Sequence, residues 1–169
     1  MIAVAIYAVM EGKPLTEEEK EPVNEAMCSG RPGELSEEEL SAVKKEITSA
    51  MKYIKPYRGP SRIWFSYQNS LQEGCNRLSF LISELTVSKQ TADLLVDLLL
   101  RLDKKLSGGV DDSDGTVGGF IYEVVDVLKK YVKIDHNCIK SFEKLIGKET
   151  MFEWEESLMR ILDEGIQEE

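Results

Sequence analysis

Apolar residues recur along most of this chain at intervals of three and four positions, which is the period of an α-helix. Residues 36–54 show the pattern most plainly. Ser36 and Glu39 have the form of an N-terminal capping box, and the apolar stripe behind them stops before Pro56. Caps, glycines and prolines separate the stripes, in place of strand-and-turn signals. The pattern therefore predicts an all-α protein.

Two helices in the middle of the chain have distinct apolar patterns. The longest is expected to open behind a turn at residues 57–61 and to reach about Leu85, with Gly74 at an inward position of its apolar seam. Such a glycine is typical of closely packed helices. Ser88 is predicted to cap the next helix, which is apolar on nearly every side and should be central. The leucines expected to face inward there are Leu94, Leu95, Leu98, Leu99, Leu102 and Leu106.

Three further segments complete the helical pattern. A stripe of valine, isoleucine and phenylalanine predicts a helix over about 115–132, and Asp135 is expected to cap a short helix that Gly147 closes. Thr150 and Glu153 have the form of a capping box, which predicts the start of the last helix. The helices thus form three pairs, with starts near 36 and 61, near 88 and 115, and near 136 and 151.

The whole chain, residues 1–169, has the size of one domain. We expect about six to seven helices. Residues 1–35 would form an N-terminal helix and an irregular connection, and residues 36–169 the three hairpins. The first helix is predicted over residues 2–10, where alternating apolar residues also permit a β-strand. No residue-level similarity relates the hairpins, so the sequence does not decide between a helical bundle and a short helical-repeat stack.

The charge of the chain narrows the range of partners. The formal net charge is -10 at neutral pH, from 31 acidic and 21 basic residues. A surface of this sign repels phosphate groups, which argues against nucleic acid as a partner over a broad face and leaves only a local basic patch open. The apolar stretch at residues 2–10 is shorter than the roughly 20 residues that span a bilayer, so no membrane partner is expected.

The cysteines indicate a reducing environment. Cys28, Cys75 and Cys138 are odd in number and show no CxxC pairing. Two of them fall within helical patterns, which favours buried thiols over disulfides. The expected location of the protein is therefore the cytoplasm.

A loop rich in glycine and aspartate at residues 107–115 suggests a calcium site, because Asp112 and Asp114 precede Gly115. Aligned with a calcium-binding helix-loop-helix, however, the loop has apolar residues at the first and last ligand positions, where carboxylates are required. We expect instead that Asp112, Ser113 or Asp114 caps the helix that follows.

No group of residues predicts catalysis. His136 is the single histidine, and Cys138 beside it has no second proton carrier or metal partner. Paired acids for general acid and base catalysis do not stand out among 31 carboxylates. We therefore expect no catalytic residue, no metal and no cofactor, and an enzyme is the less favoured class.

The sequence VDDSDG at residues 110–115 lies between two leucine- and valine-rich helices, and Phe152, Glu153 and Trp154 open a later helix. In these features residues 88–165 resemble the helical-repeat regions that accompany SWIM-type zinc fingers in proteins of unassigned function. The zinc finger itself has no counterpart, since it requires a cluster of cysteines and histidines. The resemblance implies a stacked helical scaffold for protein contacts and assigns no catalytic residue.

Residues 51–63 carry four cations and no acid, in contrast to the acidic chain around them, and aromatic residues crowd the same stretch. Arginine and tyrosine provide large anchors of low conformational entropy at interfaces, so this segment is a candidate contact surface. The candidate partner-binding residues are Lys52, Tyr53, Lys55, Tyr57, Arg58, Arg62 and Phe65.

Two interpretations of this segment remain open. In the first, Trp64 and Tyr67 belong to the core, the lysines are solvated and the arginines pair with the chain's own acids. In the second, the segment docks another protein, and the chain is a protein-interaction scaffold or adaptor. An alternative function is a small binding protein that takes an anionic ligand or single-stranded nucleic acid through residues 52–67. The sequence gives neither the identity of a partner nor the oligomeric state.

Overall fold

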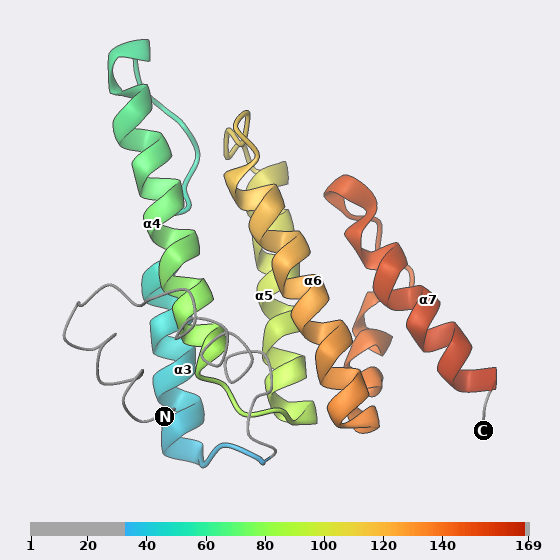
Figure 1. Ribbon diagram of the computed structural model, residues 1–169. Coiled ribbons are helices and arrows are strands. Elements are labelled where there is room, and N and C mark those ends of the chain that lie inside the picture. The colour runs from blue at the N-terminus through green and yellow to red at the C-terminus, as the bar shows by residue number, and fades with distance from the viewer. Residues whose placement is uncertain (1–32, 168–169) are drawn as a thin grey trace, which may run out of the picture.

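The computed structural model describes residues 33–167, which form five α-helices and three 3-10 helices (Figure 1). No strand occurs within this range, and the all-α fold class is confirmed. The helix predicted over residues 2–10 and Cys28 lie outside the described residues. The elements are α3 (Glu37–Ala50), η1 (Ser61–Ile63), α4 (Trp64–Ser83), α5 (Lys89–Ser107), α6 (Thr116–Ile134), η2 (His136–Leu145), η3 (Met151–Glu153) and α7 (Trp154–Gln167).

The helices pack in pairs along the chain. α3 lies against α4, α5 against α6, and η2 against α7. The pairs also pack on one another, since α4 contacts α6, and η2 contacts both α5 and α6. In Figure 1 α3 and α4 lie at one side of the molecule, α5 and α6 in the middle, and α7 at the other side. The helices in the middle therefore have neighbours on two sides.

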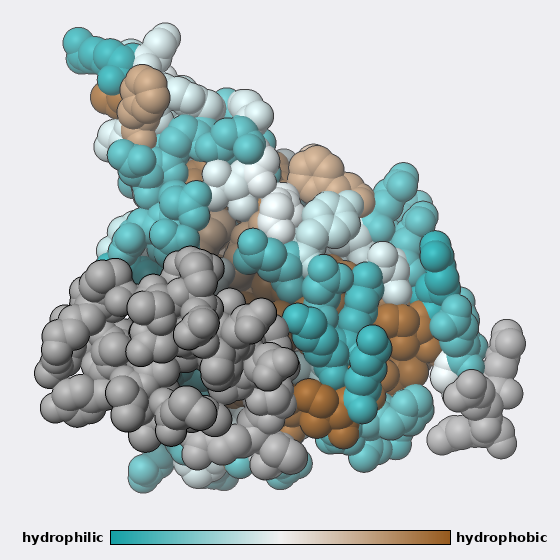
Figure 2. All heavy atoms as spheres, in the orientation of Figure 1, coloured by the Kyte–Doolittle hydropathy of each residue, from teal (hydrophilic) through white to brown (hydrophobic). Residues whose placement is uncertain are grey.

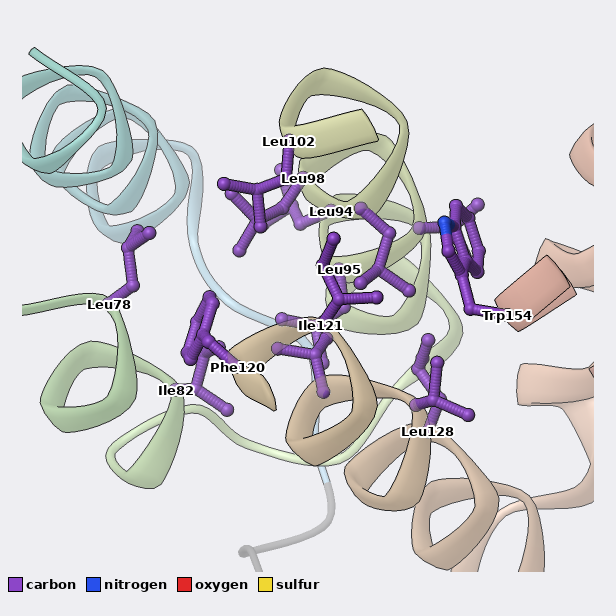
Figure 3. Close-up of a cluster of buried hydrophobic side chains, with 14 of the residues drawn as sticks. Leu78, Ile82, Leu94, Leu95, Leu98, Leu102, Phe120, Ile121, Leu128 and Trp154 are labelled. Atoms are coloured by element: carbon purple, nitrogen blue, oxygen red, sulfur yellow. The ribbon is translucent and has the colours of Figure 1, made fainter. Parts of the chain in front are cut away.

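α5 is central, as its sequence predicts. Figure 3 shows its leucines between Leu78 and Ile82 of α4 and Trp154 at the start of α7. Fully burying one leucine side chain is worth about 1.5–3 kcal/mol, so this helix contributes much of the stability of the fold. All the leucines that we expected to face inward are buried: Leu94, Leu95, Leu98, Leu99, Leu102 and Leu106.

Gly74 allows α4 to approach the end of α3. A Cβ atom at this position would lie 2.9 Å from a side-chain carbon of Ile54 and 3.2 Å from the backbone oxygen of Ala50. Protein interiors are close-packed, so a methyl group here would displace its neighbours. The predicted close packing at Gly74 is confirmed.

Two helices differ in type from the prediction. The longest helix begins with the 3-10 turn η1, and its α-helical part starts only at Trp64. The short helix after Asp135 is also a 3-10 helix, although Asp135 caps it as expected by accepting a hydrogen bond from the amide of Asn137. Both helix types place residues i and i+3 on one face, so apolar spacing over ten residues does not distinguish them.

The predicted capping box of Thr150 and Glu153 is wrong. The Thr150 hydroxyl hydrogen-bonds the carboxylate of Glu155 instead, and Glu153 has a φ of 54°. α7 begins at Trp154, whose indole Nε1 donates a hydrogen bond to Asp103 of α5 at 3.2 Å. This contact with α5 holds the start of the last helix and overrides the local capping signal.

Candidate interaction surface

The turn before α4 and the first residues of that helix stand beyond the ends of α5 and α6 (Figure 1). This projecting part, residues 55–65, is called the tip below. Two prolines restrict its backbone, and η1 leads from it directly into α4. The tip contains five of the candidate residues: Lys55, Tyr57, Arg58, Arg62 and Phe65.

Three aromatic rings hold the tip in place. Tyr57 lies edge-on to Trp64, with ring centroids 5.1 Å apart, and its ring centroid is 4.8 Å from that of Tyr67. The Tyr57 hydroxyl donates a hydrogen bond to the carbonyl of Pro60 at 2.7 Å. The hydroxyl of Tyr67, which is buried, accepts one from the backbone amide of Asp111 at 2.9 Å. These contacts connect the turn to α4 and to the loop before α6, so the tip has a defined shape.

The cations of the tip are exposed. Among residues 33–167, Lys55, Arg58 and Arg62 take part in no ion pair. The interpretation in which the arginines pair with the chain's own acids is therefore wrong for the described part of the chain. The same interpretation placed Trp64 and Tyr67 in the core, and this is confirmed for Tyr67, which is buried, while Trp64 is half-buried. The rings thus support the turn, and the cations face solvent.

The tip also exposes two large apolar side chains. Phe65 is 82 % exposed and Ile63 is 44 % exposed. Figure 2 shows hydrophobic and hydrophilic atoms side by side at the projecting end of the molecule. Ile63 was not among the candidate residues, because an apolar residue next to Trp64 in sequence is as readily part of the core. Its exposure depends on the fold, in which its side chain lies against Gly59 of the turn.

Lys52 and Tyr53 are not part of the tip. The guanidinium of Arg77 lies over the ring of Tyr53, 4.7 Å from its centroid. The Tyr53 carbonyl accepts a hydrogen bond from the Ser70 hydroxyl at 2.9 Å, and Arg77 comes a further seven residues along α4, so the ring of Tyr53 points away from the tip. Lys52 lines a shallow, open groove along the outer face of α3. The structure therefore brings together five of the seven candidates and separates the other two from them.

The thiols of the described residues are not reactive sites. Cys75 and Cys138 are both free and buried, as expected. Burial and the charge of Asp112 raise the pKa of Cys75 to about 12. Burial and the charge of Asp135 raise the pKa of Cys138 to about 11. Both thiols are protonated at neutral pH and are poor nucleophiles.

The carboxylates of the acidic loop at residues 111–115 bind backbone amides at the start of α6 and within the loop. Within the described range, histidine, cysteine, aspartate and glutamate side chains are nowhere grouped in threes as a metal site requires. None of the helices between residues 33 and 167 has the length and apolarity needed to cross a membrane.

Comparison of the chain with models of protein families, with curated proteins and with solved structures gives no match. The resemblance of residues 88–165 to the helical regions beside SWIM-type zinc fingers therefore stays a prediction.

Proposed function

We propose that this chain is a protein-interaction module, and that the tip docks onto an acidic segment of a partner protein that also carries an apolar side chain. The observation that supports this proposal most strongly is Phe65, which is 82 % exposed in the first turn of α4, beside a turn that packed aromatic rings hold and that carries cations. Exposed apolar patches with a polar rim are typical of interaction sites, and the tip exposes Ile63 together with Phe65. The partner's apolar group covers Phe65 and Ile63, and its acids face the cations.

The two parts of the tip contribute differently to binding. Fully burying an exposed phenylalanine side chain is worth about 1.5–3 kcal/mol, so Phe65 is the main source of affinity. An exposed charge pair contributes at most about 1 kcal/mol, and the cations act chiefly on encounter rate and partner choice. Binding should weaken with added salt without disappearing, because salt screens exposed charges and leaves apolar burial intact.

A single nucleic-acid strand or a small anionic ligand fits the tip less well. Proteins that bind single strands stack successive bases on exposed aromatic faces. Here the rings of Tyr57, Trp64 and Tyr67 pack against one another, which leaves Phe65 as the one exposed ring of the tip. Small ligands bind in concave sites, whereas the tip projects. A protein partner is therefore the better-supported occupant, and the buried thiols favour the cytoplasm as the place of the interaction.

The test is affinity capture from a cell lysate with the tagged chain and with the Lys55→Glu, Arg58→Glu, Arg62→Glu variant. The variant should keep the helical far-ultraviolet spectrum and the unfolding temperature of the wild type, because all three side chains are exposed. It should lose the captured protein. Phe65→Ala should weaken binding of that protein by about tenfold or more, which corresponds to the burial of one aromatic side chain.

Two matched controls make the result specific. Lys104, Lys133 and Lys140 are exposed lysines outside the tip, and changing them to Glu alters the net charge by the same amount. Phe80→Ala removes a phenylalanine that is 59 % exposed on the same helix as Phe65. Capture that survives the tip variant, or that the controls abolish equally, would exclude the tip as the binding site.

A further inference from the structure

A second exposed apolar surface lies where α6 meets the segment before α7. Phe152 is 50 % exposed, Tyr122 is 47 % exposed, and Met151 beside them is also exposed. The Tyr122 hydroxyl donates a hydrogen bond to the carbonyl of Phe152 at 2.8 Å. These three residues are called the Phe152 patch. Sequence analysis missed this patch because its two aromatic residues are 30 positions apart and meet only in the fold.

The backbone holds Phe152 in its exposed position. Phe152 and Glu153 have φ angles of 65° and 54°, a conformation that residues other than glycine rarely adopt. Asp103 fixes both ends of the segment, since its carboxylate accepts hydrogen bonds from the Met151 amide at 2.7 Å and from Trp154 Nε1 at 3.2 Å. Trp154 is fully buried. The chain therefore adopts an unfavourable backbone conformation that leaves half of an aromatic side chain exposed, and strain of this kind is typical of functional sites.

The charges around the Phe152 patch are opposite in sign to those of the tip. The part of α6 that contains Tyr122, residues 116–128, carries two acids, Glu123 and Asp126, both exposed, and no cation. Residues 149–159, on either side of Phe152 in the sequence, carry no cation and four acids, of which Glu149, Glu153 and Glu156 are exposed. Residues 51–72, which include the tip, carry four cations and no acid. One chain thus presents an exposed phenylalanine among cations and another among acids.

We propose that the tip of one copy of this chain docks on the Phe152 patch of a second copy. This inference rests on the proposed function, and it names a second copy as the acidic, apolar partner of the tip. Phe65 and Ile63 of one copy cover Phe152, Met151 and Tyr122 of the next, and the cations of the tip face the acids around the patch. The opposite charges make this pairing favourable, while tip against tip or patch against patch brings like charges together.

Such a contact joins two different surfaces, so it is heterologous. When two copies pair in this way, the tip of one and the patch of the other remain free. Further copies can bind there, so the assembly closes into a ring or extends as an open chain. The tip and the segment before α7 belong to opposite sides of the molecule in Figure 1, so each copy offers both surfaces outward. The predicted assembly grows with protein concentration and shrinks with salt.

Charge exchange between two variants tests the pairing. The tip-reversed variant carries Lys55→Glu, Arg58→Glu and Arg62→Glu, and the patch-reversed variant carries Glu123→Lys, Glu149→Lys and Glu153→Lys, all at exposed positions. Sedimentation velocity over a dilution series at low salt should show self-association of the wild type and monomers of each variant alone. An equal mixture of the two variants should associate again, because every tip then has a patch of opposite charge.

Three results would overturn the inference. They are a wild type that stays monomeric at every concentration, variants that associate like the wild type, and a mixture that stays monomeric while the wild type associates. Phe152→Ala, with Phe80→Ala as the control, supplies a second measurement that adds no charge, and it should weaken association while Phe80→Ala does not. A monomeric wild type whose tip variant still loses a captured protein would reject self-association and leave the proposed function standing. Circular dichroism of each variant confirms that it is folded.

Discussion

The carboxylate of Asp112 accepts hydrogen bonds from the backbone amides of Val117 and Gly118, at 2.7 and 2.8 Å. These amides belong to the first turn of α6, where no intrahelical partner exists. Asp114 accepts a weaker bond from Thr116 at 3.2 Å. The N-cap position itself is Gly115, so none of the three residues expected there occupies it, and Asp112 instead binds the amides of the first turn from three residues further back. At the scale of single residues, the loop that most resembles a calcium site is a helix cap.

Asp112→Ala should therefore lower the free energy of unfolding by about 1 kcal/mol, because it leaves two helical amides without a partner. Asp114→Ala is the matched control and should cost less. Chemical denaturation of both variants measures the difference. Calcium at millimolar concentration should leave the unfolding temperature unchanged, since a ligand that binds only the native state would raise it. An upward shift that Asp112→Asn removes would show that the loop is a metal site after all.

Two neighbouring glycines in α6 should respond differently to alanine. A Cβ atom at Gly118 would lie 3.1 Å from Asp112 Oδ2 and 3.4 Å from a ring carbon of Phe152, whereas one at Gly119 meets nothing within 4 Å. Alanine is favoured over glycine in a helix by about 1 kcal/mol. Gly119→Ala should stabilise the protein by up to that amount, and crowding should cancel the gain at Gly118. Equal unfolding temperatures for the two variants would contradict this packing.

Among the helices, the sequence predicts the start correctly where a capping residue directly precedes a regular apolar stripe. Ser36 and Ser88 both form the capping boxes that begin α3 and α5. The sequence did not give the type of η2 or the start of α7. Both segments pack on α5, η2 directly and the start of α7 through the bond from Trp154 to Asp103, which joins residues 51 positions apart. Local propensity carries no information about a partner at that distance.

Asp93 joins two helices through charge. It accepts a hydrogen bond from Lys89 at 2.8 Å and lies 3.5 Å from Lys144 of η2. Burial raises the pKa of Asp93, but the hydrogen bond from Lys89 and the charge of Lys144 lower it, and the net pKa is below the ordinary value. The charged form is thus favoured in the folded state, so Asp93 stabilises the fold above its unfolded pKa of about 3.9 and loses this contribution as pH falls.

Asp93→Asn should therefore lower the unfolding temperature at neutral pH, with a cost of up to about 1 kcal/mol for these partly exposed pairs. The difference from the wild type should shrink as the pH falls through 4 and below, because the wild-type carboxyl is then protonated as well. Thermal unfolding followed by circular dichroism across this range measures it. A difference that stays constant with pH would mean that Asp93 acts through packing and not through charge.

At the scale of the whole molecule, the net charge of -10 is unevenly distributed, with a basic tip on an otherwise acidic chain. The basic character of the tip is visible in the sequence, because Lys55, Arg58 and Arg62 lie close together along the chain. It could not separate Lys52 and Tyr53 from the tip, because the path of the chain from α3 to α4 decides which of these residues lie together. Nor could it show the Phe152 patch, which α6 and η3 build jointly. A surface made by neighbouring residues of the chain can thus be predicted from the sequence, whereas a surface made by distant residues cannot.

The central claim is that the tip is the part of this molecule that touches another protein chain. Photo-crosslinking tests it most directly, with p-benzoylphenylalanine placed at position 65 in one form of the protein and at position 80 in another. Both sites are exposed phenylalanines of α4, so position 80 controls for crosslinks that form by chance collision. If the tip binds a partner, position 65 should give a discrete crosslinked species in cells, which Lys55→Glu, Arg58→Glu and Arg62→Glu abolish, and position 80 should give none. Crosslinks that are absent at position 65, or that form equally at both positions, would contradict it.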